Sequence, residues 1–257
     1  MDAHKPAEIK LLIETAGVGK SRLPASQMFV LAILAGVFIG FGAAAYTVVM
    51  TGAEATYGPS RLLGGVVFSL GLILVIVGGA ELFTGNALMV MAVVERKVSI
   101  HRLLRNWGVV YLGNLFGAAA LAYCIGHAGL LDQDAGATAV RIAEAKAELS
   151  LKDAFLRGIL CNALVCLAIW LTFAARSVAG KIIAILWPIS AFVLLGLEHS
   201  VANMYFFPQA WMAGADIEVL AAAENLIVVT AGNVIGGSGG VALAYRFAYL
   251  GSSTQNT

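Results

Sequence analysis

A histidine, His199, lies deep inside a long apolar stretch and shares it with other polar side chains. The stretch reads Gly196-Leu-Glu-His-Ser-Val-Ala-Asn203, so it holds a carboxylate, an imidazole, a hydroxyl and an amide. Hydrocarbon tolerates such groups only where they face a protein interior or a water-filled path. Because histidine changes protonation near neutral pH, an imidazole in this setting can give a proton to the anion of a weak acid as it passes.

The same polar spacing occurs a second time, in the first half of the chain. Gly79-Ala-Glu81-Leu-Phe-Thr-Gly-Asn86 repeats the pattern Gly-x-Glu-x-x-x-x-Asn within another apolar run. Two corresponding interruptions of this kind indicate a transport site near the middle of a membrane. Thr84 stands at the centre of this copy, and we predict that its hydroxyl orients the His199 ring. The remaining histidines lie in polar segments or near the end of an apolar run: His4, His101 and His127.

Glutamate and asparagine frame both stretches, and we interpret these residues as structural. Where a membrane helix breaks, its freed backbone groups need partners or must line a cavity. The partners that the sequence offers are Glu81, Asn86, Glu198 and Asn203. An unpaired carboxylate at that depth would be costly and would repel anions. Neither stretch contains lysine or arginine.

The composition assigns the chain to the membrane. Of its 257 residues, 60% are hydrophobic and only 12% are charged, and its mean hydropathy is +0.87. A soluble domain could not cover that much apolar surface. Cys124, Cys161 and Cys166 lie in apolar runs without metal-ligand spacing, so we expect buried, inert thiols. We expect no metal ion, no cofactor and no nucleic-acid partner.

Six apolar runs are long enough to cross a bilayer, which predicts an all-α integral membrane protein. They cover residues 27–50, 62–94, 107–130, 154–175, 182–207 and 225–250. The second and fifth runs contain the two polar stretches, so we predict that both are broken helices. Residues 1–26 form a short amphipathic N-terminal segment, and residues 251–257 form a C-terminal tail, around a channel domain that spans residues 27–250.

Basic residues mark one side of the membrane. They precede the first run and follow the second and fourth runs: Lys5, Lys10, Lys20, Arg22, Arg96, Lys97, Arg102, Arg105, Arg176 and Lys181. The connection after the fifth run is acidic, with Asp216, Glu218 and Glu224. Short cytoplasmic loops collect lysine and arginine. We therefore expect a multi-pass protein of the plasma (inner) membrane with both termini in the cytoplasm.

The two halves of the chain resemble each other beyond the polar stretches. Asn106-Trp-Gly-Val-Val-Tyr-Leu-Gly-Asn-Leu-Phe-Gly117 returns as Asn225-Leu-Ile-Val-Val-Thr-Ala-Gly-Asn-Val-Ile-Gly236. These pairs lie 119 positions apart, against 117 for the polar stretches. Leu31–Gly36 is also similar to Arg157–Asn162, but more weakly. With three runs in each half, the second half must enter from the opposite side, which predicts an inverted 3+3 repeat.

Both polar stretches resemble the formate/nitrite transporter family, which includes formate, nitrite and hydrosulfide channels. The similarity also covers Gly-Ile-Leu-Cys-Asn-Ala-Leu-Val-Cys-Leu-Ala-Ile-Trp at 158–170 and Gly-Asn-Val-Ile-Gly-Gly at 232–237. The resemblance implies an aquaporin-like fold of six spans, with the second and fifth broken. It also implies a homopentamer in the lipid bilayer with one pore in each protomer, passing small monovalent anions and protons.

The resemblance further implies roles for single residues. His199 matches the central proton relay, and the polar pore residues are Thr84, Asn162 and Asn233. Leu82 and Leu72 with Phe68 match one hydrophobic constriction, and Phe192 belongs to the other. Lys146, ahead of the fourth span, matches a vestibule lysine that draws anions in.

Formate and nitrite are therefore the first candidates for the transported anion, and hydrosulfide is the alternative. A neutral-solute channel of the water or glycerol type shares the inverted repeat, but it should show paired Asn-Pro-Ala turns and a pore arginine. The breaks read Thr-Gly-Asn and Val-Ala-Asn instead. An intramembrane enzyme would need a nucleophile with a partner or a metal cluster, and the sequence has no such motif, so we expect no enzyme.

Overall fold

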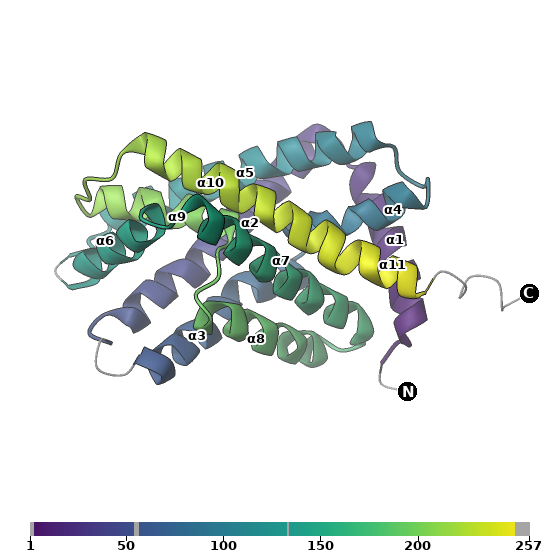
Figure 1. Cartoon of the computed structure of the whole chain (residues 1–257), viewed down its shortest axis with the longest axis horizontal. Coiled ribbons are helices and arrows are strands. Elements are labelled where there is room, and N and C mark those ends of the chain that lie inside the picture. The colour runs from purple at the N-terminus through teal and green to yellow at the C-terminus, as the bar shows by residue number, and fades with distance from the viewer. Residues whose placement is uncertain (1–2, 54–56, 133, 250–257) are drawn as a thin grey trace, which may run out of the picture.

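The computed structural model describes residues 3–53, 57–132 and 134–249, and this part of the chain is almost entirely helical (Figure 1). Within those ranges the only β pairing is an isolated bridge between Ala3 and Ala175. Five of the helices described there are long and apolar enough to cross a membrane, and two shorter apolar helices accompany them. The prediction of an all-helical membrane fold is confirmed.

The first half of the chain folds into six helical segments. In order they are α1 (Pro6–Ser21), α2 (Ala25–Met50), α3 (Tyr57–Gly78), the 3-10 helix η2 (Gly85–Met89), α4 (Val90–Val94) and α5 (Ile100–His127). α1 is the amphipathic segment predicted before the first run. Pro24 lies at the N-cap of α2, where its missing N–H costs nothing, and its extended ψ of 145° separates α1 from α2.

The second half repeats this order of long and broken helices. Its segments are α6 (Asp134–Ala147), α7 (Leu151–Ala174), α8 (Val178–Leu194), α9 (Ser200–Met212), α10 (Val219–Ile235), the π-helix η3 (Gly236–Leu243) and α11 (Ala244–Ala248). α6 was not predicted, since its sequence of mixed charge was interpreted as a connection. α10, η3 and α11 follow one another without a break and fill the sixth apolar run, and the tail at 251–257 lies outside the described residues.

Both predicted breaks are present, and a glycine in the left-handed conformation begins each. α3 ends at Gly78 and the chain turns at Gly79, with φ +81°. α8 ends at Leu194 and the chain turns at Gly196, with φ +67°. The following amides close these turns, since Ala80 N donates to Val75 O at 2.9 Å. An extended segment then runs to η2 in the first half and to α9 in the second.

Glycines bring the long helices of each half into backbone contact. α2 packs on α5, and α7 packs on α10 and η3. A Cβ atom at Gly117 of α5 would collide with the carbonyl of Ile33, and one at Gly236 would collide with the carbonyl of Ile159. The two contacts occupy matching positions of the repeat. Small residues therefore set the helix spacing in the same way in both halves.

A short helix leads each half and lies beside the broken span of that half. α1 contacts η2 and α4, and α6 contacts α9. In Figure 1, α1, α4 and α11 lie at one end of the molecule, whereas α6 and α9 lie at the other. The two breaks are thus approached from opposite ends, each under its own lead helix.

Candidate functional site

At the first break, a lysine of α1 binds the glutamate that opens it. Lys20 Nζ donates to Glu81 Oε1 at 2.6 Å and to Asn86 Oδ1 at 3.0 Å. The Asn86 amide donates to Glu81 Oε2 at 2.8 Å and to Asn106 Oδ1 at 2.8 Å. Both carboxylate oxygens thus have a donor, which a buried charge requires.

The second break repeats this arrangement at matching positions. Lys146 of α6 donates to Glu198 Oε1 at 2.9 Å, and the Asn203 amide donates to Glu198 Oε2 at 2.7 Å. The same amide donates to Asn225 Oδ1 at 2.8 Å. Lys146, predicted as a vestibule residue, therefore pairs with a carboxylate and lines a cavity as well.

One asparagine in each half holds the extended backbone of the break. The Asn114 amide donates to the carbonyls of Ala32 and Glu81 at 2.8 and 2.9 Å, and its Oδ1 accepts from Phe83 N at 2.9 Å. In the second half, Asn233 donates to the carbonyls of Gly158 and Glu198 at 2.8 and 2.9 Å. These side chains supply the partners that a broken membrane helix needs.

Asn162 and Asn233, predicted as polar pore residues, are both buried beside the Thr84–His199 pair. Asn233 is fully buried, and its Oδ1 accepts from Ser200 N at 2.9 Å. Asn162 is also buried and donates to the carbonyls of Asn233 and Thr84 at 2.6 and 3.1 Å. Neither amide lines the two cavities described below. Both hold backbone in place beside the site.

His199 joins the two breaks. Its Nε2 lies 2.9 Å from Thr84 Oγ1, so the hydroxyl meets the ring as the sequence predicted. Its Nδ1 accepts from Ala202 N at 3.1 Å, which makes His199 the N-cap of α9. Because a backbone N–H can only donate, Nδ1 carries no proton in this arrangement. The ring is therefore the neutral tautomer protonated at Nε2, which donates to Thr84.

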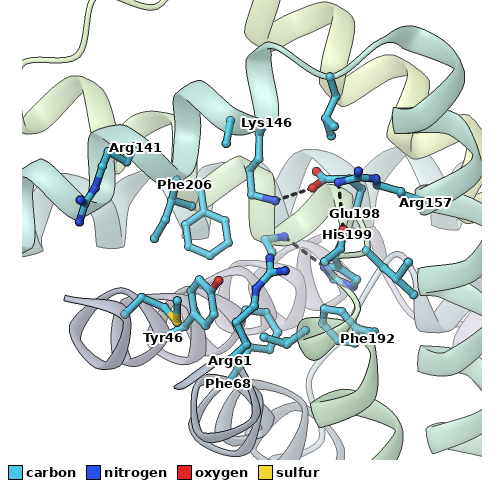
Figure 2. Close-up of a pocket in the computed structure, with 18 of the residues that line it drawn as sticks. Tyr46, Arg61, Phe68, Arg141, Lys146, Arg157, Phe192, Glu198, His199 and Phe206 are labelled. Atoms are coloured by element: carbon cyan, nitrogen blue, oxygen red, sulfur yellow. Dashed lines mark hydrogen bonds and ion pairs between the residues drawn. The ribbon is translucent and has the colours of Figure 1, made fainter. Parts of the chain in front are cut away.

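A cavity of about 390 Å³ reaches His199 from the α6 end of the molecule (Figure 2). We call it the Lys146 vestibule; its polar lining residues are Tyr46, Arg61, Thr138, Arg141, Lys146, Arg157, Glu198 and His199. His199 is only 3% exposed, so the ring forms part of the wall and not a free surface. Four cationic side chains against one carboxylate favour anions in this space.

A second cavity, of about 300 Å³, approaches the first break from the α1 end. We call it the Lys20 vestibule; its polar lining residues are Lys20, Glu81, Asn86, Thr172 and Lys181. Leu82 also lines it, two residues before Thr84. The two cavities thus approach the Thr84–His199 pair from different breaks.

Apolar side chains line the cavities beside the polar pair. Phe68 meets Phe192 edge to face, with 5.4 Å between ring centroids, and both line the Lys146 vestibule. Phe192 also stacks on His199 at 6.0 Å. Phe68 and Phe192, predicted to belong to different constrictions, are thus in contact with each other, and both belong to the same buried cluster as Leu72 and Leu82. Leu72 is buried in the core and lines neither cavity.

Several residues of the site escaped the sequence analysis. Lys20 is the partner of Glu81, and a signal for it existed, because Lys20 and Lys146 lie 126 positions apart, as Leu31 and Arg157 do. Arg61 of α3 and Arg157 of α7 also line the Lys146 vestibule; no motif marked Arg61, and Arg157 was noted only as part of the repeat.

The helical membrane fold and two cavities that approach one buried histidine define a membrane transport protein. The family profile described as formate/nitrite transporter matches residues 7–247. The chain belongs to the formate/nitrite transporter family.

Known proteins similar over nearly the whole length agree with this assignment. The chain is 42% identical over 253 residues to the uncharacterized transporter YrhG of Bacillus subtilis, covering 97% of this chain and 95% of that protein. It is 39% identical over 252 residues to the formate channel BtFdhC of Bacillus thuringiensis, covering 97% of each.

Two solved structures share the fold. An FNT family ion channel superposes with a TM-score of 0.88 at 30% identity, covering 94% of this chain and 98% of that one. A pentameric formate channel with formate bound superposes with a TM-score of 0.79 at 39% identity, covering 88% and 98%. These similar proteins are described as transporters and channels, which accords with the expectation that the chain is no enzyme.

Proposed function

We propose that this protein passes small monovalent anions, formate or nitrite, across the membrane through a hydrophobic pore in which His199 relays a proton. The observation that carries the proposal is the Thr84–His199 hydrogen bond of 2.9 Å, which joins the two breaks where the two vestibules approach each other. Formate channels among the similar proteins support the choice of anion.

The geometry supports a defined sequence of events. An anion enters a cationic vestibule and reaches the apolar collar of Phe68 and Phe192, where it cannot keep its hydration shell. His199 must first take a second proton at Nδ1 from the solution in the vestibule that it lines, which removes the hydrogen bond from Ala202 N. The approaching negative charge favours the imidazolium. The anion then takes a proton from the ring and continues as the neutral acid, and the ring returns to its neutral form.

The proposal includes the assembly and its orientation. The similar channel with formate bound is pentameric, so we infer a homopentamer with one pore in each protomer. Large apolar side chains of α5 and α10 are exposed on the single chain, including Leu112, Phe116 and Ile227, and they suit contact with lipid or with a neighbouring protomer. From the basic residues before the first run and after the second and fourth runs, we infer that the chain lies in the plasma membrane with both termini on the cytoplasmic side.

Replacing His199 by Phe tests the relay. Purified protein in proteoliposomes should lose proton-coupled flux of formate and nitrite at both acidic and neutral pH, because phenylalanine holds no exchangeable proton. His101→Phe is the matched control, since His101 is exposed near the start of α5 and should leave flux unchanged. Equal rates in wild type and His199→Phe at both pH values would overturn the relay.

A panel of solutes separates this function from its alternatives. Hydrosulfide flux above formate and nitrite flux would identify a hydrosulfide channel. Glycerol or water flux that does not change with pH would identify a neutral-solute channel. The four cations around the Lys146 vestibule favour an anion over a neutral solute.

A further inference from the structure

The two lysines of the Lys20 vestibule differ in how far their charge is compensated. Lys20 donates to Glu81 Oε1 at 2.6 Å, and the Asn86 amide donates to the other oxygen of that carboxylate at 2.8 Å. Glu81 is the acidic residue among those that line this cavity, so its charge is taken up by Lys20. Lys181 lines the same cavity and adds a positive charge beyond that pair.

Lys181 contributes little to the stability of the fold. It is half-buried, and among the described residues the lysines that form ion pairs are others: Lys10, Lys20, Lys97 and Lys146. It is also the fourth residue of α8, where a cation opposes the positive end of the helix dipole. Neither an ion pair nor its own helix therefore explains a lysine at this position.

α8 carries Lys181 to the mouth that lies far from the break of its own half. Ala175, just before α8, pairs with Ala3, so α8 begins at the α1 end of the molecule (Figure 1). The other end of α8 leads into the second break, at Gly196. Lys181 thus belongs to the second half of the chain but lines the vestibule of the first break.

The repeat places a comparable cation at the other mouth. Arg61 is the fifth residue of α3, the helix that matches α8, and it lines the Lys146 vestibule. At the offset of 117 that relates the two breaks, Arg61 matches Val178, which lies three residues before Lys181. Residues three apart share one face of a helix. Each vestibule thus receives a cation from the broken span that begins beside it.

We propose that Lys181 captures small monovalent anions at the mouth of the Lys20 vestibule and raises their concentration ahead of the pore. The inference rests on the proposed function and adds a residue outside the lysine–glutamate pairs of the breaks. One uncompensated charge a few ångströms from the path raises the local concentration of a monovalent anion about threefold at low ionic strength. A neutral acid gains nothing from this charge, so Lys181 favours the anionic form at this mouth.

Lys181→Gln removes the charge and keeps a polar side chain. Formate flux through the full chain in proteoliposomes is measured against formate concentration at ionic strengths of about 0.01 and about 0.15 M. Well below KM, we expect the flux to fall about threefold at the lower ionic strength and by much less at the higher one, because salt screens the charge. Flux at saturating formate should stay at the wild-type level, which also shows that the variant folds and assembles.

Two further variants serve as controls for the charge. Lys181→Arg keeps the positive charge and should transport as wild type does. Arg102→Gln removes one positive charge from an exposed position near the start of α5 that lines neither cavity, and it should leave the flux unchanged. A loss in Arg102→Gln equal to that in Lys181→Gln would show that the general surface charge attracts the anion, and this would overturn the inference.

Lys181→Cys allows the charge to be restored on the assembled protein, so it carries the test if Lys181→Gln does not assemble. The background is Cys124→Ser, since Cys124 is exposed whereas Cys161 and Cys166 are buried. A methanethiosulfonate reagent that attaches an ethylammonium group should raise the flux at low formate concentration about threefold. A reagent that attaches an ethylsulfonate group should lower it.

Several results would contradict the role of Lys181. These are equal flux in wild type and Lys181→Gln at low ionic strength, a loss of the same size at saturating formate, and a response of Lys181→Cys that does not depend on the sign of the attached charge. Wild-type vesicles that pass no formate or nitrite would contradict the proposed function itself, which distinguishes that failure from the failure of the inference.

Discussion

At the scale of single residues, the two ring nitrogens of His199 have different tasks. Nδ1 caps α9 by accepting from Ala202 N at 3.1 Å, and Nε2 meets Thr84 Oγ1 at 2.9 Å. A helix cap is worth about 1 kcal/mol, so protonation at Nδ1 has a modest structural cost. When Nδ1 is protonated, it and Ala202 N are both donors, so the ring must turn away from this amide.

Thr84→Val tests whether the hydroxyl positions the ring. Valine has nearly the shape of threonine but cannot accept from Nε2, so we expect proton-coupled formate flux to fall about tenfold. Thr84→Ser keeps the hydroxyl and should retain most of the flux. The measurement is stopped-flow acidification of proteoliposomes with each variant. If both variants lose flux equally, packing around Thr84 matters and its hydrogen bond does not.

Lys146→Ala tests the attraction of anions. Loss of the vestibule charge should lower flux mainly at low anion concentration and at low ionic strength. The same change leaves Glu198 buried without its cation, so the single variant also loses stability. Lys146→Ala with Glu198→Gln removes both charges and recovers stability, as measured by Tm in detergent. A flux defect that is independent of anion concentration would argue against an anion-gathering role.

At the scale of elements, the residues of the polar pair, His199 and Thr84, are those that differ between the two copies of the repeat. The position that matches His199 in the first break is Leu82, and the position that matches Thr84 in the second is Val201. Lys, Glu and Asn at the two breaks are instead the same in both halves, and their lysine–glutamate and asparagine–glutamate contacts match; Lys20 alone also donates to the asparagine of its break. The repeated residues build two equivalent breaks, and the unmatched ones place one polar pair between them.

The close helix contacts at Gly117 and Gly236 predict that a side chain at either position lowers the stability of the protein. Gly117→Ala or Gly236→Ala should lower stability by about 1–3 kcal/mol, because the added methyl collides with a carbonyl of the neighbouring helix. Gly108→Ala on α5 is the control, since a Cβ there meets nothing within 4 Å. Its effect should be neutral or stabilising, as alanine favours a helix. Tm in detergent measures all three, and equal Tm values would contradict this account of the packing.

The breaks were predictable from sequence because a membrane helix cannot hold Gly-x-Glu-x-x-x-x-Asn without a change of backbone. Helix α6 was not predictable from sequence, since its low hydrophobicity and mixed charge are equally typical of a loop. Its packing on α9 decides its structure. Asn233 illustrates the limit for side chains. An amide in a transport protein suggests a pore, yet the hydrogen bonds of the Asn233 side chain go to the backbone of α7, of the second break and of the start of α9.

At the scale of the whole molecule, the scaffold is nearly symmetric and the two mouths are not. The two equivalent breaks carry two equivalent lysine–glutamate ion pairs. The additional arginines belong to the α6 end. The repeat could be found in the sequence, but this asymmetry could not, because Arg61 reaches Gly196 only through the fold.

A network of ion pairs fastens the α1 end of the molecule. Lys10 contacts Glu14 at 3.3 Å and Glu95 at 3.4 Å, Lys97 binds Glu14, and Arg246 of α11 binds Glu95 at 3.0 Å. The network therefore connects α1, the turn after α4 and the last described helix. α1 also lines the Lys20 vestibule, so its attachment sets the shape of that mouth.

The network predicts how α1 responds to pH. Partial burial raises the pKa of Glu95, but Lys10 and Arg246 lower it by more, so its pKa lies below the usual value. A lowered pKa in the folded state means that this stabilisation is present above the unfolded pKa and is lost as the pH falls through the folded one. Glu95→Gln should therefore increase amide hydrogen exchange in α1 already at neutral pH, whereas wild type should show the increase only under acid conditions.

Glu8→Gln is the control for this measurement. Glu8 lies on the same helix, its pKa is also lowered, first by its hydrogen bond with His4, and it is not part of the network. Its replacement should affect only the first turn of α1. If Glu95→Gln exchanges as slowly as wild type at neutral pH, apolar contacts of Ile9 and Ile13 hold α1 in place and the ion pairs contribute little. Faster exchange throughout α1 shows instead that the charges fasten the helix beside the Lys20 vestibule.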